Sequence, residues 1–443
     1  MAPVRVRKPP RIGPRAGPGR DTRQSAVLSR EARRLLPGGV SSPVRAYEPY
    51  PRFMARGHGP YLEDVDGNRY VDLCLAFGPL LLGHAHPAVR EAIRDRASRG
   101  TLFGTPVEEE IIMARMLTRH HPSMERVRFV STGGEAVSSI LRLARAHTGR
   151  PAVVKMDGGF HGSLDQLLVQ AGSGAAAQPS SAGVLPNPAT PTYVVPYNDP
   201  DALSECLSMH PDVGLVLLEP VLGNMGLILP RKGYLREVAR LTRAAGALLA
   251  FDEIITGYRL GLGGAEEFYG VRPDLLALGK VLGGGLPLAA YGGRKEILQR
   301  VAPEGPVYQA GTYSGNPLSL AAGCATLRVL EKEGTSRADS ATAAIVKGMR
   351  EELERRGIPG QVSHLANMFS LFFSATPVQD AECARRAARE PFQVLSRRLL
   401  EGGVYLAQSP FETSFLSTAH GHRECEFVVD AFRDALRHLP RGH

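Results

Sequence analysis

LLAFDEIITGYRLGLGGAEEFYGVRPDLLALGK, residues 248–280, ends each of its apolar runs in a charged or reactive group. Asp252 and Glu253 close the first run, and Lys280 stands almost alone among Leu, Gly, Val and Ala. A carboxylate at the end of a buried strand needs a cationic partner or hydrogen bonds. An apolar environment lowers the pKa of a lysine and leaves its amine nucleophilic. The alternative is a lysine whose head reaches water, but the glycines on both sides indicate close approach of the backbone to a bulky group.

Working outward, short apolar runs alternate with helical segments from about residue 85 to residue 330. The runs are residues 126–132, 151–156, 192–197, 213–220, 246–254 and 288–293, and the helical segments include 108–120, 134–147 and 232–246. Apolar runs that do not alternate in polarity, interleaved with helices, predict an α/β fold with a mostly parallel sheet covered on both faces. Ligands of such sheets bind outside the carboxyl ends of the strands.

The chain of 443 residues is too long for one small core. We expect an N-terminal segment over 35–84, a large domain over 85–330 and a smaller α+β domain over 331–443. Residues 1–34 carry ten Lys or Arg against two Asp or Glu, and so hold most of the net charge of +9. This Pro/Gly/Arg-rich leader predicts a disordered, solvated tail. Because little positive charge remains for the rest of the chain, we expect no nucleic-acid partner.

Other classes of site find little support in the sequence. No run approaches the ~20 apolar residues of a membrane span, so we expect no membrane partner. Five cysteines show no CxxC spacing, which predicts reduced thiols in a cytoplasmic protein and no structural zinc. The pairs His84/His86 and His420/His422 are more typical of capping or packing than of a metal site, and we expect no metal.

Further candidates follow the other strand-like runs. Thr132, Gly133 and Gly134 stand between a strand and a helix, where backbone N–H groups bind phosphate. The ring of Phe160, next to His161, could stack on a planar cofactor. Each of these segments could also be an ordinary turn, and the same holds for the stretch after residue 218, which supplies Glu219 and Asn224.

A second small-residue turn, Gly311-Thr312, precedes another helical segment and offers a second anion site. An imine-forming lysine, a carboxylate for a pyridine nitrogen, a stacking aromatic ring and phosphate donors together indicate pyridoxal 5'-phosphate. A nucleotide-binding oxidoreductase would also explain the alternating strands. However, no GxGxxG follows a first strand, and Val281 follows Gly279-Lys280 where a P-loop has Ser or Thr.

From about Leu35 to its C-terminus the sequence resembles the class III, fold type I, pyridoxal-phosphate aminotransferases, and within them the glutamate-1-semialdehyde 2,1-aminomutases. The resemblance rests on PGGVSSPVRAY, DVDGNRYVD, GHAHP, LEPVLGN, FDEIITGYR, GGGLPLAAYGG, YQAGTYSGNP and QSPFE. It implies the fold type I transferase fold and a homodimer with shared active sites.

The resemblance also implies a role for each matching residue. Lys280 would hold the cofactor as an imine and shuttle protons, and Asp252 would keep the pyridine nitrogen protonated. Further cofactor contacts are implied for Thr132, Gly133, Gly134, Phe160, His161, Asn224, Ile254 and Gly311, with Thr312 reaching across from the other subunit. Substrate contacts are implied for Ser42, Arg45, Phe77, Ser173, Glu219, Tyr308 and Glu412. Ser173 lies in Gln170–Thr190, a segment of small residues that we expect to form a lid over the site.

Several positions depart from the aminomutase pattern. Phe77 stands where tryptophan is usual, Phe160 where tyrosine is usual, and Gly134 where threonine is usual. Because polar groups in a pocket dominate discrimination between polar substrates, we expect an aminotransferase of specialised metabolism that acts on a small polar carbonyl compound. An amine donor would load the cofactor as pyridoxamine phosphate. The alternative is a genuine 2,1-aminomutase that makes 5-aminolevulinate for tetrapyrrole synthesis and needs no outside donor.

Overall fold

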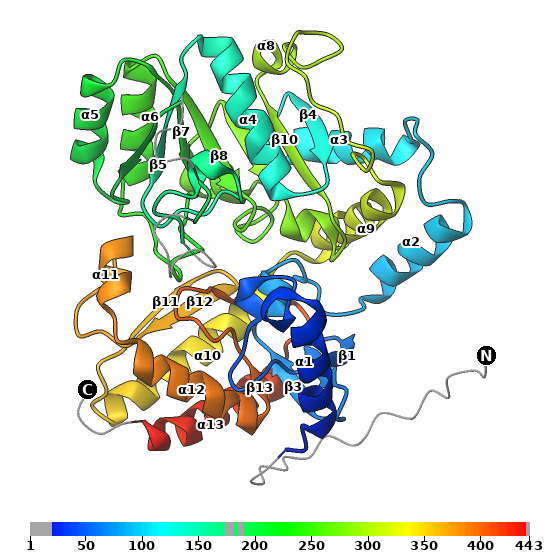
Figure 1. Cartoon of the computed structure of the whole chain (residues 1–443), viewed down its shortest axis with the longest axis vertical. Coiled ribbons are helices and arrows are strands. Elements are labelled where there is room, and N and C mark those ends of the chain that lie inside the picture. The colour runs from blue at the N-terminus through cyan, green and yellow to red at the C-terminus, as the bar shows by residue number, and fades with distance from the viewer. Residues whose placement is uncertain (1–19, 173–180, 185–189, 440–443) are drawn as a thin grey trace.

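The computed structural model describes residues 20–172, 181–184 and 190–439, which form two lobes (Figure 1). The upper lobe contains the largest sheet, and the lower lobe is built from both ends of the chain. The expected lid over Gln170–Thr190 lies mostly outside the described residues. No helix of the described part is both long and apolar enough to span a bilayer.

Seven strands form the sheet of the upper lobe. In spatial order they are β4 (Arg126–Val130), β10 (Ala289–Gly293), β9 (Leu275–Leu278), β8 (Leu248–Glu253), β7 (Val213–Leu218), β5 (Ala152–Met156) and β6 (Thr192–Val195). Strand β10 is antiparallel to both of its neighbours, and the other pairs are parallel. The predicted mostly parallel sheet is confirmed, although β9, with only four residues, was not among the expected runs.

Both faces of this sheet are buried, as the unbroken apolar runs predict. In β8, Leu248 and Ala250 enter one core while Leu249 and Phe251 enter the other. Helices α4 (Gly133–Thr148) and α8 (Lys295–Leu298) close the first face. The second face is covered by α3 (Glu108–His120), α5 (Pro200–Met209), α6 (Tyr234–Ala244) and α9 (Pro317–Glu333), with α2 (Pro87–Ser98) packed against α9. This double burial fixes the strand ends that carry the candidate site.

The lower lobe joins the two ends of the chain in one core. Strands β11 (Gln361–Leu365), β12 (Met368–Phe372) and β14 (Ser414–Phe415) form an antiparallel sheet. Strands β1 (Met54–His58), β2 (Tyr61–Asp64), β3 (Arg69–Asp72) and β13 (Val404–Tyr405) form a second sheet, in which β13 runs parallel to β3. Helices α10 (Ser336–Arg355), α12 (Arg389–Gly402) and α13 (His422–Ala435) pack on this lobe, and Val71 and Leu73 share their core. Two further short helices are α7 (Gly264–Tyr269), between β8 and β9 in the sequence, and α11 (Ala381–Arg386), after β12.

The N-terminal leader is not disordered over its whole predicted length. Helix α1 spans Arg23–Leu35 and packs beside the lower lobe (Figure 1). The carboxylate of Asp66 accepts hydrogen bonds from the backbone N–H groups of Gln24 and Ser25 at 2.7 and 3.0 Å and so caps the helix. The prediction of disorder is therefore wrong over residues 20–34, because the partner that satisfies the helix start lies about forty residues away in the sequence. Residues 1–19 lie outside the described part.

Candidate active site

A cavity of about 870 Å³ lies at the carboxyl ends of β4, β5, β7, β8 and β9. This is the edge at which parallel sheets bind ligands. Of the residues predicted from the sequence, the cavity brings together Ser42, Phe77, Thr132, Gly133, Gly134, Phe160, His161, Glu219, Asn224, Asp252, Ile254, Lys280 and Glu412. The first and last of these residues, Ser42 and Glu412, are more than 350 positions apart in the sequence.

Lys280 follows β9 directly, at the start of a short 3-10 helix (Lys280–Gly283). Its backbone is left-handed, with φ +47, so the side chain leaves the strand at a turn. Desolvation lowers the pKa of the amine, and the nearby carboxylates of Glu412 and Glu219 oppose this effect. The amine therefore loses its proton more readily than an exposed lysine does, as a nucleophile requires.

Asp252, at the end of β8, is buried and held by two hydrogen bonds. Its Oδ2 lies 2.8 Å from His161 Nδ1, and its Oδ1 accepts from the Ile254 N–H at 3.1 Å. His161 is itself buried, and its Nε2 has no hydrogen-bond partner. The hydrogen bond between His161 and Asp252 orients the carboxylate inside the cavity. Both residues were predicted from the sequence, but the hydrogen bond between them was not.

Glu219 is buried, and its carboxylate binds the loops that carry Phe160 and Asn224. Its Oε1 accepts from the Phe160 N–H and from Asn224 Nδ2, and its Oε2 accepts from the Gly223 N–H, each at 2.9 Å. Burial raises the pKa of this carboxyl, and the nearby Asp252 carboxylate acts in the same direction. Glu219 thus holds Phe160 and Asn224 at the cavity wall.

Lys155 supports the loop that follows β5 and carries Phe160. The sequence analysis did not identify this residue. Its side chain is fully buried, and its ammonium group donates to the carbonyls of Gly159, Leu167 and Val169 at 2.9, 3.2 and 2.7 Å. Desolvation lowers its pKa to about 8. A lysine inside the otherwise apolar run of β5 was the available signal, because a buried cation needs several acceptors.

The start of α4 forms a close-packed anion site. Thr132 caps the helix through its hydroxyl, which accepts from the Glu135 N–H at 3.3 Å. Gly133 and Gly134 open the first turn, where free N–H groups and the helix dipole attract anions. A side-chain Cβ on Gly162 would lie only 2.6 Å from the Gly134 Cα. Glycine is therefore needed for this close approach.

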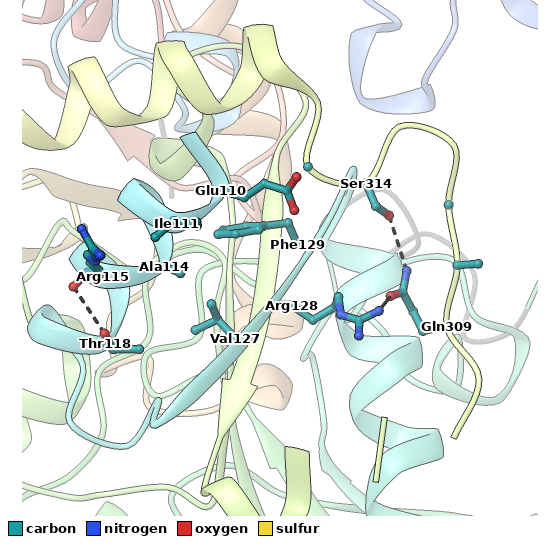
Figure 2. Close-up of a pocket in the computed structure, with 13 residues that line it drawn as sticks. Glu110, Ile111, Ala114, Arg115, Thr118, Val127, Arg128, Phe129, Gln309 and Ser314 are labelled. Carbon is teal, nitrogen blue, oxygen red and sulfur yellow. Dashed lines mark hydrogen bonds between the residues drawn. The ribbon is translucent and has the colours of Figure 1, made fainter. Parts of the chain in front are cut away.

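Four predicted residues do not line the Lys280 cavity of this single chain. Arg45 is exposed, and Tyr308, with 72% of its surface exposed, and Thr312 are exposed as well. Gly311 lines a different cavity of about 760 Å³. Figure 2 shows this second cavity between α3, β4 and the loop of Gln309 and Ser314. Ser173 lies outside the described residues.

Other cavity residues were not predicted as site residues. They are Pro43, Val44, Pro79, Gly162, Ser163, Leu168, Ser181, Ile255 and Gly285–Leu288. Ser131, which precedes the small-residue turn at Thr132, lines the cavity as well. The GGGLP motif was a usable signal for Gly285–Leu288, because a left-handed glycine turn brings backbone close to the site. In the described part of the chain, no three His, Cys, Asp or Glu residues gather as a metal site.

The donor set fits a phosphorylated pyridine aldehyde. The cavity presents an amine of lowered pKa, an oriented carboxylate, an aromatic ring and a helix start that admits an anion. At this helix start the backbones of Gly162 and Gly134 approach each other closely, and a Cβ on Gly162 would collide with the Gly134 Cα. These are the groups needed to hold such a cofactor by its aldehyde, ring nitrogen, ring face and phosphate.

Comparison with protein families matches residues 43–413 to the model of the class-III aminotransferases. Among curated relatives, a glutamate-1-semialdehyde 2,1-aminomutase from Archaeoglobus fulgidus is 50% identical over 93% of this chain and 99% of its own length. A relative of the same name from Roseiflexus castenholzii is 48% identical over 94% of this chain and 98% of its own length.

Solved structures share the same fold. A transaminase with bound PLP has a TM-score of 0.87 and 32% identity, over 94% of this chain and 98% of that chain. A glutamate-1-semialdehyde-aminomutase from Pseudomonas aeruginosa PAO1 has a TM-score of 0.85 and 30% identity, over 94% of each chain. The structural comparison alone therefore does not separate transaminases from aminomutases.

Proposed function

Because this chain belongs to the class III aminotransferase family, we propose that it is a glutamate-1-semialdehyde 2,1-aminomutase that produces 5-aminolevulinate. The observation that carries the proposal is the 50% identity to an enzyme of that name over 93% of the chain. It favours the alternative interpretation of the sequence over our first expectation, an aminotransferase of specialised metabolism. The chain is in either case an enzyme that depends on pyridoxal 5'-phosphate.

When bound, pyridoxal phosphate supplies an electron sink that lets an amino group and a proton change carbons. We assign Lys280 to its aldehyde carbon and Asp252 to its ring nitrogen, with Phe160 against the ring and the α4 start at the phosphate. The hydrogen bond between His161 and Asp252 supports this arrangement, since it fixes the orientation of the carboxylate. Asn224 and Ile254 complete the cofactor wall.

The Lys280 amine is the group that we propose to move protons during the reaction. Its lowered pKa makes the amine easier to deprotonate and so available as a base, and its left-handed turn directs it into the cavity. Ser42, Phe77 and Glu412 line the same cavity and form the proposed substrate side. We keep Arg45 and Ser173 as proposed substrate residues on the resemblance alone.

We further propose a homodimer in which Tyr308, Gly311 and Thr312 of one subunit complete the cavity of the other. Support comes from the exposure of Tyr308 and Tyr313, at 72% and 63%, because large aromatic side chains on one loop are unusual on a free surface. The free cysteines, four of them buried, are compatible with a reducing cytoplasm.

The decisive test is turnover of glutamate-1-semialdehyde by the purified protein without an added amine donor. We expect formation of 5-aminolevulinate, and we expect the Lys280→Ala variant to form none. An enzyme that turns over carbonyl compounds only with an external amine would be the specialised aminotransferase of our first expectation. That result would refute the aminomutase proposal and leave the family assignment intact.

A further inference from the structure

Among the residues that the structure describes, Arg259 is a buried cation with no carboxylate at ion-pair distance. Its side chain is fully inaccessible to solvent. One guanidinium nitrogen, Nη1, donates to Asn367 Oδ1 at 2.7 Å, and the other, Nη2, donates to the carbonyl of Gly78. The guanidinium also lies over the ring of Phe415, 4.4 Å from its centre. Asn367 Nδ2 donates in turn to Asp339 Oδ1 at 2.9 Å, so the amide links the guanidinium to a carboxylate. Burying a guanidinium without a directly paired carboxylate is costly, which calls for a reason to keep it.

One partner of Arg259 ends an unusual turn. Leu75, Ala76 and Phe77 have φ values of +47, +57 and +62, three consecutive non-glycine residues in the left-handed region. A side chain in this region is strained, because its Cβ lies too close to the following carbonyl oxygen. Asp72 fastens the start of the turn by accepting from the Leu75 N–H at 3.0 Å. Arg259 fastens its end at Gly78, and the turn carries Phe77 into the cavity.

Arg259 also lies beside the reactive lysine. A Cβ placed on Gly78 would be 3.1 Å from Arg259 Nη2 and 3.4 Å from Lys280 Cδ, so both side chains flank the same glycine. The charged groups with the largest effects on the Lys280 amine are Glu412, Glu219, Arg259 and Asp252. Three of them are carboxylates that favour the ammonium form, and Arg259 is the single cation among them.

We propose that Arg259 is a positioning residue with two effects: its charge disfavours a proton on the Lys280 amine, and its hydrogen bonds hold the left-handed turn that presents Phe77. This inference rests on the proposed role of Lys280. A purely structural arginine would stabilise the fold and leave both the ionisation at Lys280 and substrate affinity unchanged. The two interpretations therefore differ in measurable ways.

The test uses the full-length holoenzyme with Arg259→Gln, which removes the charge, and Arg259→Lys, which keeps the charge but lacks the planar fork. Arg96→Gln is the matched control, because it removes another buried guanidinium. Arg96 Nη1 lies 3.4 Å from Glu109 Oε1, and Arg96 does not line the Lys280 cavity. The first readout is the pH midpoint of the bound cofactor's absorbance. The second, on the full chain stripped of cofactor, is the pH dependence of Lys280 labelling by trinitrobenzenesulfonate, located by mass spectrometry. The third is KM for glutamate-1-semialdehyde.

We expect Arg259→Gln to raise both midpoints by about one unit, the lower end of shifts between neighbouring charges. Arg259→Lys should leave the midpoints unchanged. It should raise KM for glutamate-1-semialdehyde several-fold, because the left-handed turn loses the hydrogen bond that holds its end at Gly78. Arg96→Gln should change neither. If Arg259→Gln does not fold, Arg259→Lys decides alone: a raised KM supports the proposal and an unchanged KM overturns it.

Folded Arg259→Gln protein with wild-type midpoints and KM would overturn the proposal, as would an equal shift in Arg96→Gln. Failure of the proposed function is recognised separately. If wild-type protein binds no pyridoxal phosphate or does not turn over the semialdehyde, the labelling titration of Lys280 still decides whether Arg259 controls its ionisation.

Discussion

At the scale of single residues, the charges at Asp252 and Lys280 could be found from the sequence because each interrupts an apolar run. The structure places both residues in the lining of one cavity. The bond between His161 and Asp252 could not be found, because the two residues are 91 positions apart and belong to different strand ends. Arg259 was visible only as part of a motif, and one of its buried contacts, Asn367, comes from the turn between β11 and β12 of the lower lobe.

His161→Leu tests whether the histidine orients the proposed cofactor carboxylate. The change removes a hydrogen bond to a charged group, worth about 1.5–3 kcal/mol, so we expect cofactor affinity to fall roughly ten- to a hundredfold. His147→Leu is the control, because His147 is only part-buried and lies at the far end of α4. Titration of the stripped proteins with pyridoxal phosphate measures both. Equal affinities for wild type and His161→Leu would contradict the assignment.

At the scale of elements, most strands of the central sheet were predicted correctly because double burial produces unbroken apolar runs. The four-residue β9 was missed, since so short a run is ambiguous without its neighbours in the sheet. The phosphate site at the start of α4 was predicted from the small residues there. The structure gives a further reason for a glycine nearby, which is a close contact between two loops. The backbone at Gly162 presses against Gly134, and nothing in the local sequence reports this contact.

Gly162→Ala tests that contact. A Cβ there would meet the Gly134 Cα at 2.6 Å, and the φ of +86 adds its own strain. Gly149→Ala is a matched control, with φ +69 and no atom within 4 Å. Both variants should lose about 1 kcal/mol of stability from the left-handed backbone. Only Gly162→Ala should also lose cofactor affinity, measured by absorbance titration; normal affinity would show that the α4 start is not the phosphate site.

At the scale of the whole molecule, the expected leader boundary failed for a physical reason. Local composition predicts disorder where arginine and glycine are frequent, but α1 is stabilised by Asp66 in the distant hairpin. The same limit applies to the lower lobe, where β3 and β13 pair across more than 300 residues. The boundaries expected at residues 85 and 331 stay predictions.

Stability should depend on pH through Glu253, which is fully buried beside the site. Burial raises its pKa from the ordinary 4.5 to about 7. Between these values the folded state binds more protons than the unfolded state, so the free energy of unfolding falls as pH rises, by up to about 3 kcal/mol. Glu253→Gln mimics the protonated form. Denaturant unfolding across this window should show a smaller decline for the variant than for wild type, and parallel declines would contradict the prediction.

The most direct test of the central claim is covalent trapping at Lys280. Purified protein loaded with pyridoxal phosphate is reduced with borohydride, digested and mapped by mass spectrometry. We predict one phosphopyridoxyl group on the peptide that contains Lys280, and none on that peptide in Lys280→Ala. Protein that stays unlabelled, or a label at another lysine such as Lys155 while Lys280 remains free, would contradict the account.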